Sequence, residues 1–168
     1  MEEYLYSDDK KEMYALLKEQ LKALLEGERH VLPNLSNASA LLNGALRSIN
    51  WVGFYLRYGE ELLLGPFQGK PACVHIAWGK GVCGTACARN ATQLVKDVHQ
   101  FPGHIACDCA SRSEIVIPLR REGKVIGVLD IDSPILNRFD EKDAHELEEF
   151  ARILEESCDW DECVLPDR

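Results

Sequence analysis

The chain has 168 residues, of which 46% are hydrophobic and 28% are charged, as in a globular protein with one sizeable core. Its formal net charge of −9 argues against nucleic acid or an anionic membrane as a partner, because phosphate binding requires clustered lysine and arginine. No apolar run is long enough to cross a membrane, and the acidic first residues do not resemble a signal peptide, so we expect a cytoplasmic protein.

Two helices are predicted in the first part of the chain. Over residues 9–29, apolar side chains recur every three or four residues, which predicts a helix that packs on the domain or on a second copy, and Gly27 fits its end. Its apolar face would comprise Met13, Leu16, Leu17, Leu21, Leu24 and Leu25. A second helix is expected to begin at Asn34, after a break at Pro33. Its apolar body would comprise Leu35, Ala38, Ala40, Leu41, Leu42, Ala45 and Leu46.

Short segments rich in β-branched and aromatic residues predict strands. They are residues 49–56, 62–67, 72–77, 93–95, 113–119 and 124–131. The first two and the last two form hairpins, and a glycine-spaced loop at 79–84 leads into a short helix whose free N–H groups suit an anion. A closing helix begins after Asp140. This order predicts an α+β fold, with a mostly antiparallel sheet and helices packed against it.

Acidic residues stand at the ends of the last two strands. Asp130 and Asp132 are two residues apart, so the alternation of side chains along a strand puts both on one face. Glu114 begins the preceding strand, after a long polar connection at residues 97–109 that is either a mobile loop or an active-site lid. Alone, such acids are more often a solvated strand end.

The chain contains seven cysteines, an odd number that cannot all pair within one chain. In a reducing compartment they are metal ligands, catalytic thiols or buried apolar residues. Cys107 is the best candidate for a reactive thiol, because a loop of small residues presents it just before a buried strand. We interpret Cys87 as a packing residue. Cys158 and Cys163 could form a redox pair, but we interpret them as exposed bystanders. A zinc site is an alternative, although the common Cys-x-x-Cys spacing is absent. Its ligands would come from Cys83, Cys87, Cys107, Cys109, His99 and His104.

Several ungapped motifs occur in order along residues 9–155. They are WVGFY at 51–55, GPFQGKPAC at 65–73, GKGVCG at 79–84, GHIACDCASRSEIVIP at 103–118 and GVLDIDS at 127–133. With these motifs the sequence closely resembles the free methionine-(R)-sulfoxide reductases, which are small enzymes built on a GAF domain. The resemblance implies one GAF domain over residues 1–157 and a C-terminal tail at 158–168.

The resemblance also implies an activity. A family member reduces free L-methionine-(R)-sulfoxide to L-methionine, with electrons from a thioredoxin-type reductant. Cys107 matches the family's nucleophile and Cys73 its resolving cysteine, with Cys83 as a second resolving candidate. We expect neither a cofactor nor a resident metal, and the family and the first helix together suggest a homodimer.

The family's substrate pocket maps onto Trp51, Tyr55, Glu114, Asp130 and Asp132. Alone, the two aromatic residues would more often be core. Together the five suit a free amino acid, because its ammonium group balances buried carboxylates and aromatic faces suit its sulfur. Glu114 and Asp132 would divide the sulfoxide oxygen and the ammonium group between them, in an order left open. Backbone N–H groups at residues 110–113 would bind the substrate carboxylate.

The chemistry agrees with this cysteine pattern. A thiolate attacks the sulfoxide sulfur, a proton reaches the departing oxygen, and the resulting sulfenic acid condenses with a second thiol to a disulfide. The competing interpretation is a GAF module that binds a small ligand without reaction, and such a module would not need Cys107.

Overall fold

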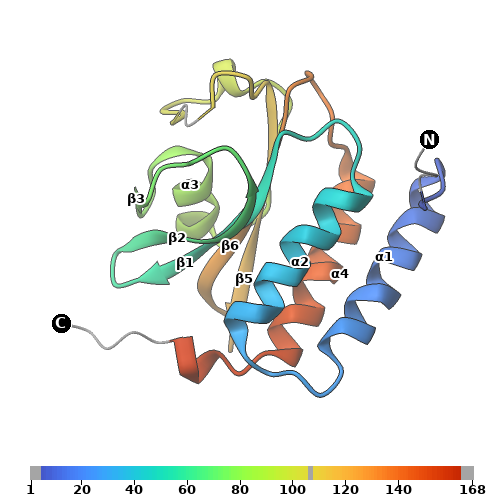
Figure 1. Cartoon of the computed structure of the whole chain (residues 1–168). Helices are drawn as coiled ribbons and strands as arrows, with labels where there is room; N and C mark the ends of the chain where they lie inside the picture. Colours follow the sequence, from blue (N-terminus) through green and yellow to red (C-terminus); the bar gives the residue numbers. More distant parts are fainter. Residues whose placement is uncertain (1–4, 106–107, 164–168) are drawn as a thin grey trace.

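A six-stranded antiparallel sheet forms the centre of the domain, in a computed structural model that describes residues 5–105 and 108–163 (Figure 1). The strand order is β3-β2-β1-β6-β5-β4, so that β1 and β6, far apart in the sequence, pair at its centre. The strands are β1 (Trp51–Tyr58), β2 (Glu61–Gly69), β3 (His75–Ala77), β4 (Gln93–Val95), β5 (Ser113–Arg121) and β6 (Lys124–Ser133). The predicted α+β fold with a mostly antiparallel sheet is confirmed.

Helices cover the two faces of the sheet unequally. On one face α2 and α4 pack against the strands and α1 packs outside them, whereas α3 lies on the other face (Figure 1). The helices are α1 (Lys10–Leu25), α2 (Val31–Ala45), α3 (Gly81–Arg89) and α4 (Glu141–Ser157), with two 3₁₀ turns, η1 (Val98–Gln100) and η2 (Trp160–Cys163). The sheet thus separates a large apolar core from a smaller one beneath α3, and this smaller side carries the candidate site.

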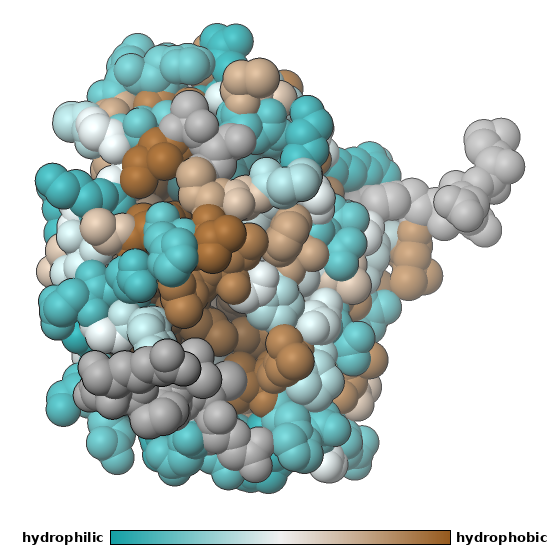
Figure 2. Space-filling model, turned by 60° about the vertical axis from the view of Figure 1, so that its left-hand side comes forward, coloured by the Kyte–Doolittle hydropathy of each residue, from teal (hydrophilic) through white to brown (hydrophobic). Residues whose placement is uncertain are grey.

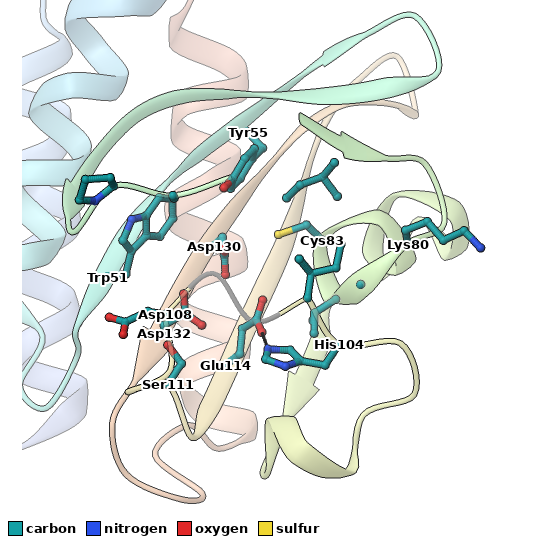
Figure 3. Close-up of a pocket in the computed structure, with 16 residues that line it drawn as sticks. Trp51, Tyr55, Lys80, Cys83, His104, Asp108, Ser111, Glu114, Asp130 and Asp132 are labelled. Atoms are coloured by element: carbon teal, nitrogen blue, oxygen red, sulfur yellow. Dashed lines mark ion pairs between the residues drawn. The ribbon is translucent and has the colours of Figure 1, made fainter. Parts of the chain in front are cut away.

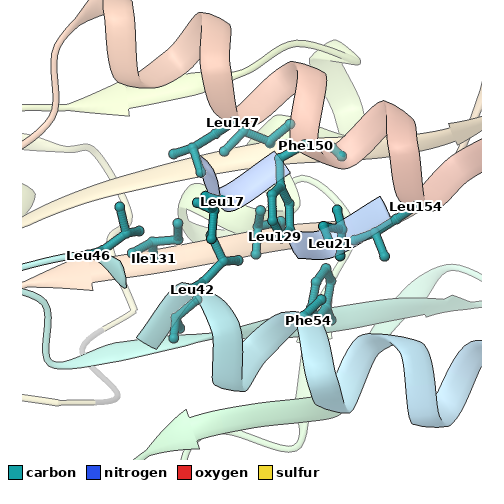
Figure 4. Packing of buried hydrophobic residues seen from close by; sticks show 14 of the residues in the cluster. Leu17, Leu21, Leu42, Leu46, Phe54, Leu129, Ile131, Leu147, Phe150 and Leu154 are labelled. Atoms are coloured by element: carbon teal, nitrogen blue, oxygen red, sulfur yellow. The ribbon is translucent and has the colours of Figure 1, made fainter. Parts of the chain in front are cut away.

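The large core is built from leucine and phenylalanine side chains of α1, α2, α4 and the central strands (Figure 4). Fully buried members include Leu17, Leu21, Leu42, Phe54, Leu129, Phe150 and Leu154. Burying one such side chain contributes about 1.5–3 kcal/mol, so this layer holds β1 and β6 together. The three-and-four spacing of the helices places their apolar positions on the sheet side.

The predicted face of α1 is partly wrong. Leu17 and Leu21 are fully buried, but Leu16 and Leu24 are 39% and 45% exposed, because they lie on the flank turned away from α2 and α4. Tyr14, which the pattern omitted, is buried instead. The predicted end at Gly27 is confirmed by its positive φ of 76° beyond the last helical turn.

The predicted start of α2 is also wrong. The helix begins at Val31, and Pro33 lies in its first turn rather than breaking the chain. Proline is tolerated there because the first N–H groups of a helix have no partner within it. Of the predicted apolar body, Ala40 is exposed, since it lies on the solvent side.

The C-terminal segment packs more closely than expected. Cys158 is buried and accepts a hydrogen bond from Asn34 Nδ2 at 3.5 Å, so the interpretation of Cys158 as exposed is wrong. Trp160 is buried in the large core, with its indole N–H on the Glu155 carbonyl. Within the described part of the chain, no helix has the length and apolarity needed to cross a membrane.

A pair of substitutions tests the orientation of α1. Leu17→Ala should lower the free energy of unfolding by about 2–5 kcal/mol, because it leaves a cavity between α1 and the core. Leu16→Ala, one residue away on the exposed flank, should change it by less than about 0.5 kcal/mol. Urea denaturation of both variants measures the difference, and equal losses would contradict the assigned face.

Candidate active site

A pocket opens on the α3 side of the sheet, between the ends of β1, β5 and β6 and the loops that precede α3 and β5 (Figure 3). On the side of the molecule that carries β3 and α3, hydrophobic side chains gather around a hollow in the surface (Figure 2). Six of the residues predicted for the site line this pocket, namely Trp51, Tyr55, Cys83, Glu114, Asp130 and Asp132. Cys107 lies outside the described residues.

The sheet register brings the three acids together. Glu114 on β5 is paired directly with Asp132 on β6, and Asp130 lies two residues back on the same face of β6. Asp132 and Asp130 pair on their other side with Trp51 and Gly53 of β1. Side chains opposite one another on neighbouring strands are about 5 Å apart at Cβ, so one side of the pocket carries three carboxyl groups.

Burial raises the pKa of each of these carboxyl groups, because the cavity solvates charge poorly. The pKa of Asp130 rises to about 6, although hydrogen bonding to Glu114 and Cys83 lowers it. The pKa of Glu114 rises well above its usual range through burial and then through the charges of Asp130 and Asp132. Burial, followed by the charge of Asp130, raises the pKa of Asp132 in the same way. Among the described residues, Oδ1 of Asp130 is buried and has no hydrogen-bond partner, so it can accept a hydrogen bond from a bound cation or another donor.

Basic side chains are scarce around these acids. Among the described lining residues only Lys80 and His104 are basic, and Lys80 is exposed and directed away from the acids (Figure 3). His104 Nε2 lies 3.7 Å from Oε2 of Glu114. Burial lowers the pKa of His104, with a smaller effect from His99, so this imidazole is largely neutral near pH 7.

Cys83 reaches the acids from the first turn of α3. Its thiol is buried, and burial, followed by the charges of the three acids, raises its pKa well above the usual value. One ligand atom each from Cys83, Glu114 and Asp130 lies within 4.8 Å of the others, so these three residues could hold a metal ion. Cys87 does not join this group, and burial raises its pKa to about 12. Cys109 is free and exposed.

Cys73 stands beside the pocket rather than in its lining. It is disulfide-bonded, whereas Cys83, Cys87 and Cys109 carry free thiols. The Tyr55 hydroxyl donates a hydrogen bond to the Cys73 carbonyl at 2.9 Å. One aromatic residue of the pocket therefore holds the backbone of a disulfide-bonded cysteine.

Trp51 and Tyr55 form an aromatic wall on β1. Their rings stack at 5.9 Å, and Trp51 also stacks on Phe67 of β2 at 5.3 Å. The indole N–H donates to the Lys70 carbonyl. Gly53 between them has no room for a side chain, because an added Cβ would lie 2.3 Å from that of Phe67. The wall depends on this close approach of β1 and β2.

Sequence patterns did not indicate several polar residues that lie in the pocket or beside it. Asn50 Nδ2 donates to Asp108 Oδ2 and to Ser111 Oγ, both at 3.1 Å, and so ties the loop before β5 to the start of β1. Hydrogen bonds from the Ala110 backbone and then from Asn50 lower the pKa of Asp108, which keeps this acid ionised. Only the position of Asp108 in the motif at 103–118 could have suggested a role for it.

The backbone donors expected at residues 110–113 are already used. Ala110 N donates to Asp108 Oδ1, Ser111 N to the Asp108 carbonyl, and Arg112 N to the Ser133 carbonyl. The expectation of a carboxylate site there is wrong, because the N–H groups of Ala110, Ser111 and Arg112 already donate to acceptors within the protein. The first turn of α3 is the better donor set, since its N-cap Lys80 makes no side-chain cap and Lys80, Gly81 and Val82 line the pocket.

Comparison with known proteins agrees with this architecture. Residues 20–156 match the GAF domain family, so the protein is a GAF domain with an acid-lined pocket. The free methionine-R-sulfoxide reductase of Escherichia coli is 54% identical over 147 residues, which are 88% of this chain and 89% of that protein. The chain belongs to the GAF-domain family of free methionine-(R)-sulfoxide reductases, which are oxidoreductases.

Solved structures are similar over nearly the whole chain. The fRMsr of Staphylococcus aureus, in complex with substrate, has a TM-score of 0.83 and 58% identity, covering 87% of this chain and 95% of its own. The free methionine-R-sulfoxide reductase of Neisseria meningitidis, in complex with its substrate, has a TM-score of 0.88 and 46% identity, covering 94% and 95%.

The raised pKa of Asp130 predicts a pH-dependent stability. The folded state binds this proton more tightly than the unfolded state, whose pKa is near 3.8, so the resulting stability is complete below about pH 4 and is lost as pH rises through about 6. Asp130→Asn escapes this loss and should gain up to about 3 kcal/mol over the wild type between about pH 4 and pH 7.5.

Denaturant unfolding across that pH range measures the gain. Glu60→Gln provides the control, because its side chain is 89% exposed and lies far from the acids in the sheet, at the β1–β2 turn. A stability difference between Asp130→Asn and the wild type that does not vary with pH would contradict the assigned burial of charge.

Proposed function

We propose that this protein reduces free L-methionine-(R)-sulfoxide to L-methionine through a cysteine sulfenic acid and a disulfide, with electrons from a thioredoxin-type reductant. Relatives named for this activity support the substrate. One structural observation carries the proposal, namely three largely buried carboxyl groups beside an aromatic wall in a single pocket. A free amino acid supplies the ammonium group that such a pocket lacks.

The substrate's three polar groups have separate partners in this proposal. Asp130 and Asp132 receive the ammonium group, and the orphan oxygen of Asp130 accepts one of its hydrogen bonds. The first turn of α3 binds the carboxylate through its free N–H groups. Trp51 and Tyr55 contact the methyl group and sulfur, because aromatic rings attract polarisable sulfur. Glu114 then donates a proton to the sulfoxide oxygen.

Glu114 suits proton donation because burial and the neighbouring acids raise its pKa and so favour its protonated form. The thiolate of Cys107 attacks the sulfoxide sulfur, and the oxygen, as it transfers to the cysteine, takes the Glu114 proton. The products are a sulfenic acid on Cys107, methionine and the Glu114 carboxylate. His104, Ile105 and Asp108, which flank Cys107 in the sequence, line the pocket and support this assignment.

Cys73 is the preferred resolving thiol. It attacks the sulfenic acid, which releases water and forms a disulfide, and a dithiol reductant then restores both thiols. Its disulfide-bonded state supports this redox role. Cys83 is a poorer candidate, because its buried thiol has a raised pKa and so ionises little.

Assembly and location follow the family resemblance and are part of the proposal. The family resemblance supports a homodimer. A thioredoxin-type reductant and reduced free cysteines are consistent with the cytoplasm.

Cys107→Ser should abolish reduction of free methionine-(R)-sulfoxide, because serine supplies no sulfur nucleophile. The assay follows reductant oxidation with each sulfoxide epimer separately, and Cys109→Ser, two residues away, is the matched control that should retain activity. Turnover in Cys107→Ser would reject the nucleophile. Binding of the sulfoxide by the wild type without any turnover would favour the alternative, a ligand-binding GAF module without chemistry.

Blocking the amino group of the substrate should remove most activity. N-acetyl-methionine sulfoxide and an oxidised peptide lack the ammonium group, and each would leave the acids of β6 unbalanced. We expect kcat/KM at least about 100-fold below that of the free amino acid, equivalent to about 2.7 kcal/mol. Comparable rates on free and peptide-bound sulfoxide would contradict the assignment of Asp130 and Asp132.

A further inference from the structure

We propose that His104 is a proton-relay and positioning residue that returns a proton from solvent to Glu114 after each turnover. The inference rests on the proposed reductase function and adds a residue to it. It starts from the contact of the imidazole with Glu114, where Nε2 lies 3.7 Å from Oε2. In the close-up, the His104 ring points at this carboxyl group from the loop that precedes β5 (Figure 3).

Exposure decreases from the imidazole to the acid. The His104 side chain is 13% exposed and that of Glu114 is 6% exposed, so the histidine is the more accessible of the two groups in contact. A buried acid that gives up its proton needs such an intermediary, because few water molecules reach it directly. At 3.7 Å, a small rotation of either side chain brings the two groups within hydrogen-bond distance.

The other groups around His104 do not serve as well. Asp130 and Asp132 from β6 face Glu114, but in the proposed function they are engaged with the ammonium group of the substrate. Cys83 from α3 holds its proton tightly. His99 from η1 is the nearest other base acting on His104, and it is exposed. Lys80 points away from the acids (Figure 3).

The proton balance of the step is simple. Transfer to the sulfoxide oxygen leaves Glu114 as a carboxylate beside a neutral imidazole. This new negative charge favours protonation of His104, which takes one proton from solvent on its outer nitrogen and delivers one from Nε2 to Glu114. The neutral imidazole then carries its proton on the outer nitrogen instead of Nε2. Proton exchange with water restores the original tautomer. One solvent proton enters through the relay for each sulfoxide reduced, and ionisation of the Cys107 thiol to the attacking thiolate returns one, so the cycle consumes no net proton.

The relay predicts a difference between the first turnover and later ones. In the proposed mechanism the resting enzyme already carries the Glu114 proton, so a single turnover in His104→Ala should proceed within about threefold of the wild-type rate. Multiple turnover, under a small dithiol raised until the rate no longer depends on it, should fall about 10- to 100-fold and fall further as pH rises. Added imidazole should restore much of the loss, because it fits the space of the deleted ring. His99→Ala should show neither effect.

Each outcome decides the question. Unchanged multiple turnover in His104→Ala would overturn the relay, and so would equal losses in single and multiple turnover without imidazole rescue, which would mean a structural role. His104→Gln keeps a polar side chain of similar reach but cannot carry a proton. Its multiple turnover should fall as in His104→Ala, but added imidazole should not restore it, because the glutamine side chain occupies the space of the deleted ring. Wild-type enzyme that reduces no free methionine sulfoxide would instead reject the proposed function itself.

Discussion

The site depends on holding three carboxyl groups in one largely buried cavity. Burial raises the pKa of Glu114, Asp130 and Asp132, and the charge of Asp130 adds to this effect at Glu114 and Asp132. The cavity is therefore ready to receive a cation and to give up a proton. Both properties come from one electrostatic constraint, and in the proposed function a zwitterionic sulfoxide uses both.

The sheet supplies this constraint through its register. Pairing of β5 with β6 sets Glu114 opposite Asp132, and pairing of β6 with β1 sets the aromatic wall beside the acids. The large core behind α2 and α4 fixes these strands, so the cavity cannot expand to admit more water. The stability that this core contributes offsets the free-energy cost of holding three carboxyl groups together in the pocket.

The thiols divide according to their surroundings. Cys83 lies among the acids, where burial keeps it protonated, whereas Cys73 lies beside the pocket in a disulfide, its backbone held by Tyr55. Reactivity toward sulfoxides requires a thiolate, so a cysteine within the acid cluster is poorly suited to it. The proposed relay through His104 follows the same logic, because it lets a proton cross from solvent without opening the cavity.

Sequence alone determined the helices, the hairpins and the same-face position of Asp130 and Asp132, because the periods of 3.6 and 2 are local properties of the backbone. It also pointed to Glu114, Trp51 and Tyr55 through their motifs. Only the tertiary structure decided which flank of α1 is buried, that Pro33 lies within α2, and that the N–H groups after Asp108 are occupied. The contact of His104 with Glu114 and the hydrogen bonds of Asn50 likewise depend on the tertiary structure. They involve segments that are far apart in the sequence or irregular loops, where no periodic pattern predicts which residues will meet.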